Sequence, residues 1–394
     1  PIIVSKNTGM DKKVEKYLTK FSAFCNEYQW WLDDFALFMA LKDKFNGLEW
    51  IKWDKDIVFR KPETLEKLKI ELKEEIQFYK FWQYIFQTQW LEIKKYANER
   101  NIKIIGDIPI FVAFDSADVW ANKQYFKLLE TGKPSVVAGV PPDYFSKTGQ
   151  LWGNPLYNWQ AFKDTGFDWW LKRIGYSLYL FDGLRIDHFR GFEACWTIPA
   201  SEKTAVNGYW DKAPGFELFQ TITNSLKNPF IIAEDLGVIT PEVERLRDNF
   251  KFPGMKILQF AFSAPDNPYL PHNYTNNCVV YTGTHDNDTT VGWYKKLDSK
   301  TKKIVKQYLP KFDTKNLHWQ FIEYAAASAA NYVLIPMQDI LGLGSAARMN
   351  TPGIAADNWR WRAVLSDFND KISDKLLEIT VKYNRIVIKE TNDK

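Results

Sequence analysis

Short apolar stretches that end in polar residues recur along this chain, and helical stretches separate most of them. Six segments have this pattern, at residues 102–112, 181–190, 230–235, 255–260, 278–286 and 332–339. Repeated alternation of strand and helix predicts a parallel sheet with right-handed crossovers. Acids lie at four of the strand ends, namely Asp107, Asp187, Glu234 with Asp235, and Asp286. Polar groups at the carboxyl ends of parallel strands are typical of a β/α barrel, which places its active site there.

A doubly wound sheet is the competing architecture, but no glycine-rich phosphate loop follows any of the strands. The first part of the chain has a different pattern. Residues 11–100 are expected to be mostly helical, and Pro62 is expected to open a long helix whose apolar positions step by three and four up to Ile93. The aromatic stripes there indicate core rather than a binding site.

Composition excludes several classes of protein. The chain has 394 residues, of which 45% are hydrophobic and 25% are charged, as in globular proteins. A net charge of +4 without a basic cluster argues against a nucleic-acid partner. No apolar stretch reaches the roughly 20 residues of a membrane span. Cys25, Cys195 and Cys278 are far apart, which disfavours disulfides and a zinc site and favours a cytoplasmic location.

The segment around Asp187 has the chemistry of a carboxylate nucleophile. Arg185 and Asp187 are two residues apart on a predicted strand, so their side chains point to the same side. A cation beside a carboxylate favours its ionised form, which a nucleophile requires. When this segment is considered alone, a structural ion pair between the same two residues is the favoured interpretation.

Three strand-end acids, Asp187, Glu234 and Asp286, match the needs of glycoside cleavage. A retaining glycosidase uses one ionised carboxylate to attack the anomeric carbon and one protonated carboxyl group to protonate the leaving oxygen. A third carboxylate can bind the distorted sugar. The sequence supplies these residue types but not their separation, so the retaining outcome does not follow from spacing.

The sequence closely resembles glycoside hydrolase family 77, the 4-α-glucanotransferases, which are β/α-barrel relatives of the α-amylases. The resemblance extends over nearly the whole chain and is densest at residues 106–112, 138–146, 151–157, 185–191, 233–237, 268–274, 284–287 and 358–362. It implies that Asp187 is the nucleophile, Glu234 the general acid/base and Asp286 the third carboxylate. It also implies sugar-binding roles for Arg185, His285, Tyr144, Gln150, Trp152 and Asn358.

Residues 138–157 contain several prolines and glycines and are expected to form a long irregular loop, which by the resemblance covers the cleft. By the resemblance, Tyr144, Gln150 and Trp152 on this loop contact glucan. Aromatic residues make up 16% of the chain, and exposed rings can stack on sugars. A covering loop that excludes water favours transfer to a sugar acceptor over hydrolysis.

The expected activity is therefore transfer of α-1,4-glucan segments between maltooligosaccharides or to glucose, with neither a metal nor an organic cofactor. The expected fold is α/β, a TIM (β/α)8 barrel of the α-amylase type with helical insertions. About six of its eight strands are present, because the family's N-terminal section finds no match here. Residues 1–100 would form a helical insertion before the third strand, and residues 101–394 the barrel.

Two other functions stay open from the sequence. One is an amylase-like hydrolase with the same three acids. The other is an inactive glucan-binding fragment, because a barrel without two adjacent strands leaves two open sheet edges. Nothing in the sequence fixes the oligomeric state.

Overall fold

The computed structural model describes residues 12–142, 146–354 and 356–386. Two compact units divide the chain, Pro1–Leu246 and Arg247–Lys394. The N-terminal helices belong to the first unit together with the residues that follow them up to Leu246. The predicted domain division near residue 100 stays a prediction.

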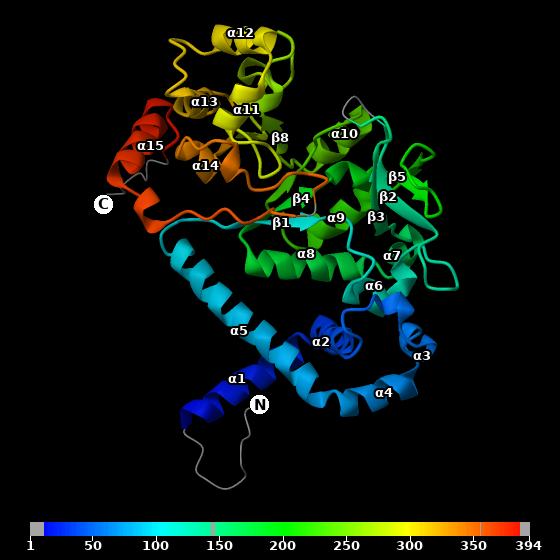
Figure 1. Cartoon of the computed structure of the whole chain (residues 1–394). Coiled ribbons are helices and arrows are strands. Elements are labelled where there is room, and N and C mark those ends of the chain that lie inside the picture. Colours follow the sequence, from blue (N-terminus) through cyan, green and yellow to red (C-terminus); the bar gives the residue numbers. More distant parts are fainter. Residues whose placement is uncertain (1–11, 143–145, 355, 387–394) are drawn as a thin grey trace. The chain divides into compact units, whose positions relative to one another are not determined.

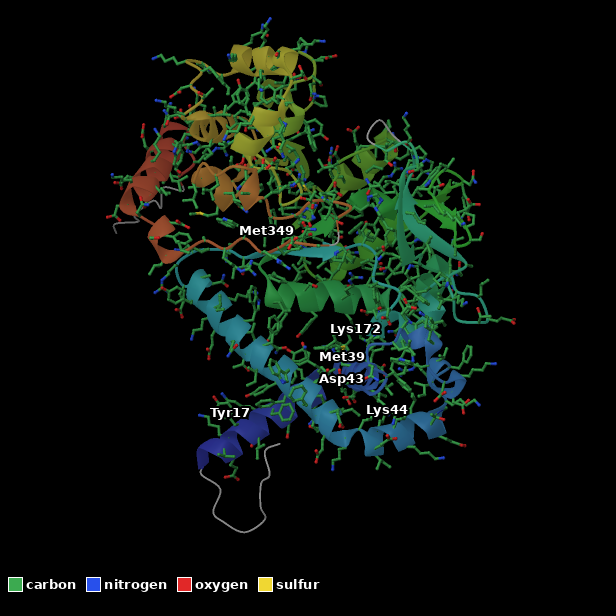
Figure 2. All side chains as sticks on the ribbon, in the orientation of Figure 1. Tyr17, Met39, Asp43, Lys44, Lys172 and Met349 are labelled. Carbon is green, nitrogen blue, oxygen red and sulfur yellow. The ribbon has the colours of Figure 1, made fainter. Side chains whose placement is uncertain are left out.

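The N-terminal part of the first unit is helical, as predicted (Figure 1). Its elements are α1 Lys12–Glu27, α2 Gln29–Lys44, α3 Lys55–Val58, α4 Pro62–Glu71 and α5 Lys73–Asn98, with a 3-10 turn at Trp50–Lys52. Phe24, Tyr28, Leu32 and Tyr84 form a shared aromatic core between these helices. Asp43 on α2, labelled in Figure 2, accepts a 2.6 Å hydrogen bond from the Tyr79 hydroxyl of α5.

Two expectations for this part are wrong. The helix that begins at Pro62 ends at Glu71, and a second helix begins at Lys73, so the predicted long helix is two helices. The apolar residues on α5 are not all core, because Trp82, Phe86 and Ile93 are exposed. Periodicity identifies an apolar face of a helix, but it does not show whether another element covers that face.

A parallel sheet forms the centre of the first unit. Its strands are β1 Ile105–Pro109, β4 Gly183–Asp187 and β7 Ile231–Ala233, paired in the order β1-β4-β7. Helix α8 Asp168–Leu180 precedes β4 and contacts both β4 and β1, and α9 Gly215–Ser225 precedes β7. The remaining helices are α6 Ala117–Ala121, α7 Trp159–Asp164 and α10 Pro241–Asn249, the last of which crosses the unit boundary.

An antiparallel sheet in the same unit was not predicted. Its strands are β2 Val136–Val140, β3 Gln150–Pro155, β5 Ala194–Pro199 and β6 Tyr209–Lys212, in the order β3-β2-β5-β6. Residues 138–157 therefore contain most of a hairpin, and the expectation of an irregular loop is wrong. The glycines and prolines give this stretch the composition of a loop, so its strands were not recognised. In the structure, a register shift between Val137 and Gly139 accommodates the irregular pairing of β2 with β3.

The second unit contains the other parallel sheet. Strands β8 Gly254–Ile257, β9 Cys278–Tyr281 and β10 Tyr332–Leu334 pair in the order β10-β9-β8. Its helices are α11 Thr290–Lys296, α12 Ser299–Tyr308, α13 Leu317–Ala326, α14 Met337–Ile340 and α15 Asp370–Lys382. Asp298 caps α12 by accepting hydrogen bonds from the amides of Lys300 and Thr301. The six predicted strands are thus confirmed, as two parallel sheets of three strands, one in each unit.

Candidate active site

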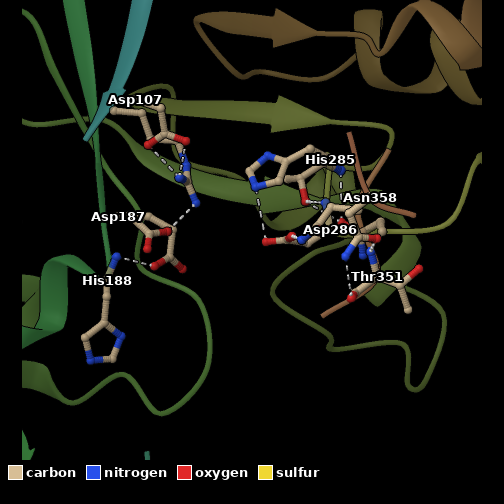
Figure 3. A network of polar contacts seen from close by, with 12 residues as sticks. Asp107, Asp187, His188, His285, Asp286, Thr351 and Asn358 are labelled. Carbon is tan, nitrogen blue, oxygen red and sulfur yellow. Dashed lines mark hydrogen bonds and ion pairs between the residues drawn. The ribbon is translucent and has the colours of Figure 1, made fainter. Parts of the chain in front are cut away.

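Arg185 links two carboxylates in the first unit. Strand β1 pairs with β4 so that Asp107 lies opposite Arg185, and Pro109 lies opposite Asp187. The Arg185 guanidinium donates two hydrogen bonds to Asp107, at 2.8 and 2.7 Å, and one to Asp187 at 3.0 Å (Figure 3). Burial acts to lower the pKa of Arg185, but the charges of Asp107, Asp187 and Glu234 outweigh burial and raise it. This cation therefore stays charged beside Asp187.

Glu234 lies at the end of the neighbouring strand. Ala233 pairs with Ile186, so Glu234 follows β7 at the level where Asp187 ends β4. Its side chain is buried, and its two oxygens accept backbone hydrogen bonds from His188 at 2.7 Å and Leu236 at 2.8 Å. Burial and the Asp187 charge raise the pKa of Glu234 to about 7, against the opposing effects of Arg185 and the two amides.

Within the first unit, therefore, two carboxyl groups at neighbouring strand ends have different electrostatic environments. Asp187 is bound to the Arg185 cation, and Glu234 is buried. This is the arrangement that allows one carboxyl group to attack as an anion while the other supplies a proton near neutral pH.

Trp152 of β3 lies beside the same strand end. Its indole packs edge-on against the His188 ring at 4.7 Å and lies 6.5 Å from the Phe111 ring. The Trp152 Nε1 donates to the Gln150 side-chain oxygen at 3.1 Å. Gln150 and Trp152 are both exposed, which leaves them accessible to a ligand. Tyr144, predicted for the same role, lies outside the described residues.

Asp286 is held in the second unit by a network of its own. It lies in the loop after β9, where Asn350 donates to its carboxylate at 2.6 Å and Arg348 donates to its backbone oxygen. The His285 Nε2 is 3.3 Å from the second Asp286 oxygen (Figure 3). The His285 ring packs 5.1 Å from the Trp359 ring.

The same loop is fixed at both ends by a buried acid. Asp339 is 1% exposed, and it accepts hydrogen bonds from the Thr282 hydroxyl at 2.5 Å and from the Thr290 amide and hydroxyl, both at 2.7 Å. Thr282 follows β9 and Thr290 begins α11, so the Asp339 carboxylate closes the loop that carries Asp286.

The Asn358 side chain forms hydrogen bonds with nearby backbone groups. Its side chain accepts a hydrogen bond from the Thr351 amide at 2.9 Å and donates to the Ile354 oxygen at 2.6 Å. These bonds shape the turn that precedes Trp359, whose amide donates to the Met349 oxygen at 2.7 Å. The predicted contact of Asn358 with sugar stays a prediction.

Sequence reasoning missed several of these partners. Asp107 was recognised as a strand-end acid but not as the main partner of Arg185, because strand pairing was unknown. Asp339 lies at the end of a predicted strand, which was the available signal for it. Nothing in the local sequence indicated that Arg348 and Asn350 would bind Asp286.

Metal sites and membrane spans are both absent from the described residues. They contain no group of three or more His, Cys, Asp or Glu residues arranged to hold a metal ion. None of their helices is long and apolar enough to cross a membrane.

Comparison with known proteins agrees with the resemblance found in the sequence. The 4-alpha-glucanotransferase family matches residues 4–366. The chain is 54% identical to 4-alpha-glucanotransferase of Synechocystis sp., over 96% of this chain and 75% of that protein. It is 50% identical to 4-alpha-glucanotransferase of Thermus thermophilus, over 90% and 73% respectively.

Its structure is similar to that of amylomaltase from Streptococcus agalactiae in complex with acarbose. The TM-score is 0.91 at 41% identity, covering 94% of this chain and 75% of that one. The amylomaltase of Corynebacterium glutamicum shares the fold at 17% identity, with a TM-score of 0.75. The chain therefore belongs to the 4-alpha-glucanotransferase family, glycoside hydrolase family 77.

Proposed function

We propose that the chain transfers α-1,4-glucan segments from one maltooligosaccharide to another, or to glucose, through a covalent glycosyl-enzyme. The observation that carries this proposal is the carboxyl pair in the first unit, with Asp187 bound to Arg185 and Glu234 buried with a pKa of about 7. The names of the relatives, 4-alpha-glucanotransferase, support the class of substrate and the reaction.

The reaction proceeds in two displacements. An Asp187 oxygen attacks the anomeric carbon while Glu234 gives its proton to the glycosidic oxygen, so the bond breaks and the leaving glucan departs neutral. The Glu234 carboxylate then takes the proton from the hydroxyl of an acceptor glucan. That hydroxyl attacks the same carbon, the ester bond to Asp187 breaks, and both carboxyl groups return to their starting states.

Asp286 is the third carboxylate in this proposal, and it binds hydroxyls of the sugar whose ring is distorted. His285 hydrogen-bonds the same sugar. The support is the Thr284–Asn287 motif of the sequence and the network that fixes Asp286 by Asn350 and Arg348. Arg185 contributes by keeping Asp187 ionised.

Tyr144, Gln150, Trp152 and Asn358 are assigned to contacts with the glucan chain. The exposure of Gln150 and Trp152 beside the His188 turn supports this for two of them. Once the glycosyl-enzyme forms, a bound acceptor and a covered site favour the sugar hydroxyl over water. The balance between transfer and hydrolysis follows from that competition.

The two parallel sheets are proposed to be segments of a TIM (β/α)8 barrel of the α-amylase type, with the helices of residues 1–100 as an insertion. The structural similarity to amylomaltase supports this assignment. The reaction as written needs neither metal nor organic cofactor. Cys25, Cys195 and Cys278 are in the reduced thiol form, which supports a reducing compartment such as the cytoplasm.

A maltotriose assay with products separated by size tests the proposed activity. The chain and an Asp211→Asn variant should both produce a ladder of shorter and longer glucans. Asp211 is a suitable control because it forms an ion pair with Lys127, and neither of these side chains has a role in the proposed reaction. Asp187→Asn should lose about a thousandfold or more of the rate, because the nucleophile is removed.

Glucose and maltose as the only products would instead identify a hydrolase. Absence of any product, together with glucan affinity that is lost on Trp152→Ala, would identify a binding protein. Substantial transfer by Asp187→Asn would refute the assignment of the nucleophile.

A further inference from the structure

The turn that follows β4 has an unusual backbone. His188 has φ +51° and ψ +49°, the left-handed region that residues other than glycine rarely adopt. It stands between the end of β4 at Asp187 and the 3-10 turn Phe189–Phe192. A residue held in this region is a reason to look for a function of the turn.

Two consecutive backbone amides of this turn donate hydrogen bonds to the same residue, Glu234. The His188 amide donates to the Glu234 side-chain Oε2 at 2.7 Å, and the Phe189 amide donates to the Glu234 backbone oxygen at 3.0 Å. The Leu236 amide holds the other side-chain oxygen at 2.8 Å. The φ and ψ angles of His188 fix how these two consecutive amide planes are oriented relative to each other, so the left-handed conformation lets both amides reach Glu234.

The His188 ring acts as an uncharged packing group. It makes an edge-on contact with Trp152 at 4.7 Å and lies 6.4 Å from the Phe111 ring. Its Nε2 is shielded from solvent and has no hydrogen-bond partner among the described residues. Burial and the Arg190 charge lower the pKa of His188 to about 3, so the ring is neutral at working pH. It cannot serve as the proton donor itself.

We propose that His188 is a positioning residue for the acid/base, since its left-handed backbone turns two consecutive amides toward Glu234 and its ring anchors the turn on Trp152. This rests on the proposed function of Glu234. An amide that donates to a carboxylate favours the ionised form, so the turn opposes burial and keeps Glu234 able to release its proton. Asp187 and Arg185 are the charged groups that face Glu234.

Two substitutions of similar size separate the backbone from the ring. Both His188→Asn and His188→Val remove the ring and its contact with Trp152. Asn tolerates the left-handed region, whereas the β-branched Val disfavours it strongly. The titration of Glu234 can be followed by 13C NMR of the chain labelled at the glutamate carboxyl carbon, with the signal assigned by its loss in Glu234→Gln.

The Glu234 titration in His188→Asn should stay near that of the unchanged chain. In His188→Val it should move up by roughly one pH unit, because the two amides can no longer reach Glu234 together and the bond to the carboxylate is weakened. On maltooligosaccharides, the basic limb of the kcat/KM profile should move with it, and both variants should share any rise in KM that loss of the ring contact causes. His188→Ala, which disfavours the left-handed region less than Val, replaces Val if circular dichroism shows that Val does not fold.

Equal Glu234 titrations in the Asn variant and in the Val or Ala variant would overturn the proposal, whatever their activities. The proposed function fails separately, if Glu234→Gln keeps full transfer activity. A purely structural role for His188 would lower thermal stability in both variants without moving the titration of Glu234.

Discussion

At the scale of single residues, two carboxyl groups at neighbouring strand ends lie in opposite electrostatic surroundings. Asp187 is bound to a guanidinium, which opposes its protonation. Glu234 is removed from water and lies in the field of Asp187, which opposes its ionisation. One fold thus provides an anion and an acid a short distance apart, without a metal ion in the reaction as proposed.

The pH dependence of transfer should follow Glu234. Because Glu234 must carry a proton in the first step and its pKa is raised to about 7, kcat/KM should fall as the pH rises through about 7. Steady-state rates with maltotriose between pH 5 and 9 measure this. A profile that stays flat to pH 9 would contradict Glu234 as the acid.

The free energy of unfolding should also depend on pH through Glu234. The pKa of Glu234 is about 7 in the folded chain, against 4.5 for an ordinary glutamate side chain, so the folded state binds this proton more tightly than the unfolded chain. The stabilisation is fully present below pH 4.5 and is lost as the pH rises to about 7. Relative to Glu234→Gln, the unfolding free energy should fall by about 3 kcal/mol over that interval.

Denaturant unfolding of the chain and of Glu234→Gln at pH 4.5 and pH 8 gives this difference. Glu242→Gln is the matched control, because Glu242 lies on the exposed start of α10 and its pKa is lowered by its own backbone amide and by Thr240 and Arg245. If the difference between the chain and Glu234→Gln is the same at both pH values, folding does not raise the pKa of the Glu234 carboxyl group.

At the scale of elements, the loop between β9 and α11 is closed by one side chain. Asp339 binds no sugar in the proposal, yet it joins Thr282 at the end of β9 to Thr290 at the start of α11. Thr289 caps α11 by accepting from the Gly292 amide at 3.1 Å. The loop that carries Asp286 is therefore fixed at both ends by groups that have no contact with the substrate in the proposal.

Asp339→Asn should weaken this closure. One Asp339 oxygen accepts from the Thr282 and Thr290 hydroxyls and the other from the Thr290 amide. The NH2 group of Asn must face either that amide or both hydroxyls, which disturbs these bonds at a cost of about 1–3 kcal/mol. Thermal unfolding and KM for maltotriose measure the two consequences, a lower Tm and weaker binding. Thr282→Val, which removes one donor and keeps the shape, should cost less. Equal losses for both variants would mean that packing, and not the carboxylate, holds the loop.

Most elements near the site could be predicted from the sequence, and the exceptions have physical causes. The parallel strands were found because buried strands are continuous apolar runs that end in polar residues, as Leu184, Ile186 and Asp187 illustrate. The hairpin of β2 and β3 was missed because Gly139, Gly149 and Pro155 give the composition of a loop. Strand pairing is a tertiary property, so the bond from Arg185 to Asp107 could not be read from residues 78 positions apart.

At the scale of the whole molecule, charge is nearly balanced, with 52 basic and 48 acidic side chains and a net charge of +4. A neutral glucan gains little from such a field, since long-range electrostatic attraction acts on charged ligands. The ion pair of Arg185 with Asp187 is a short-range contact and is screened little by salt.

The affinity for maltooligosaccharides should therefore be almost independent of ionic strength. Between 50 mM and 500 mM NaCl, KM for maltotriose should change by less than about twofold, because no charge on the substrate is screened. A protein that neutralises several phosphates would lose about a thousandfold or more over a smaller increase in salt. Steady-state rates at five salt concentrations decide the point, with dextran sulfate as a polyanionic competitor. A steep dependence of KM on salt, or strong competition by dextran sulfate, would show that the binding surface recognises charge and that a neutral glucan is the wrong substrate class.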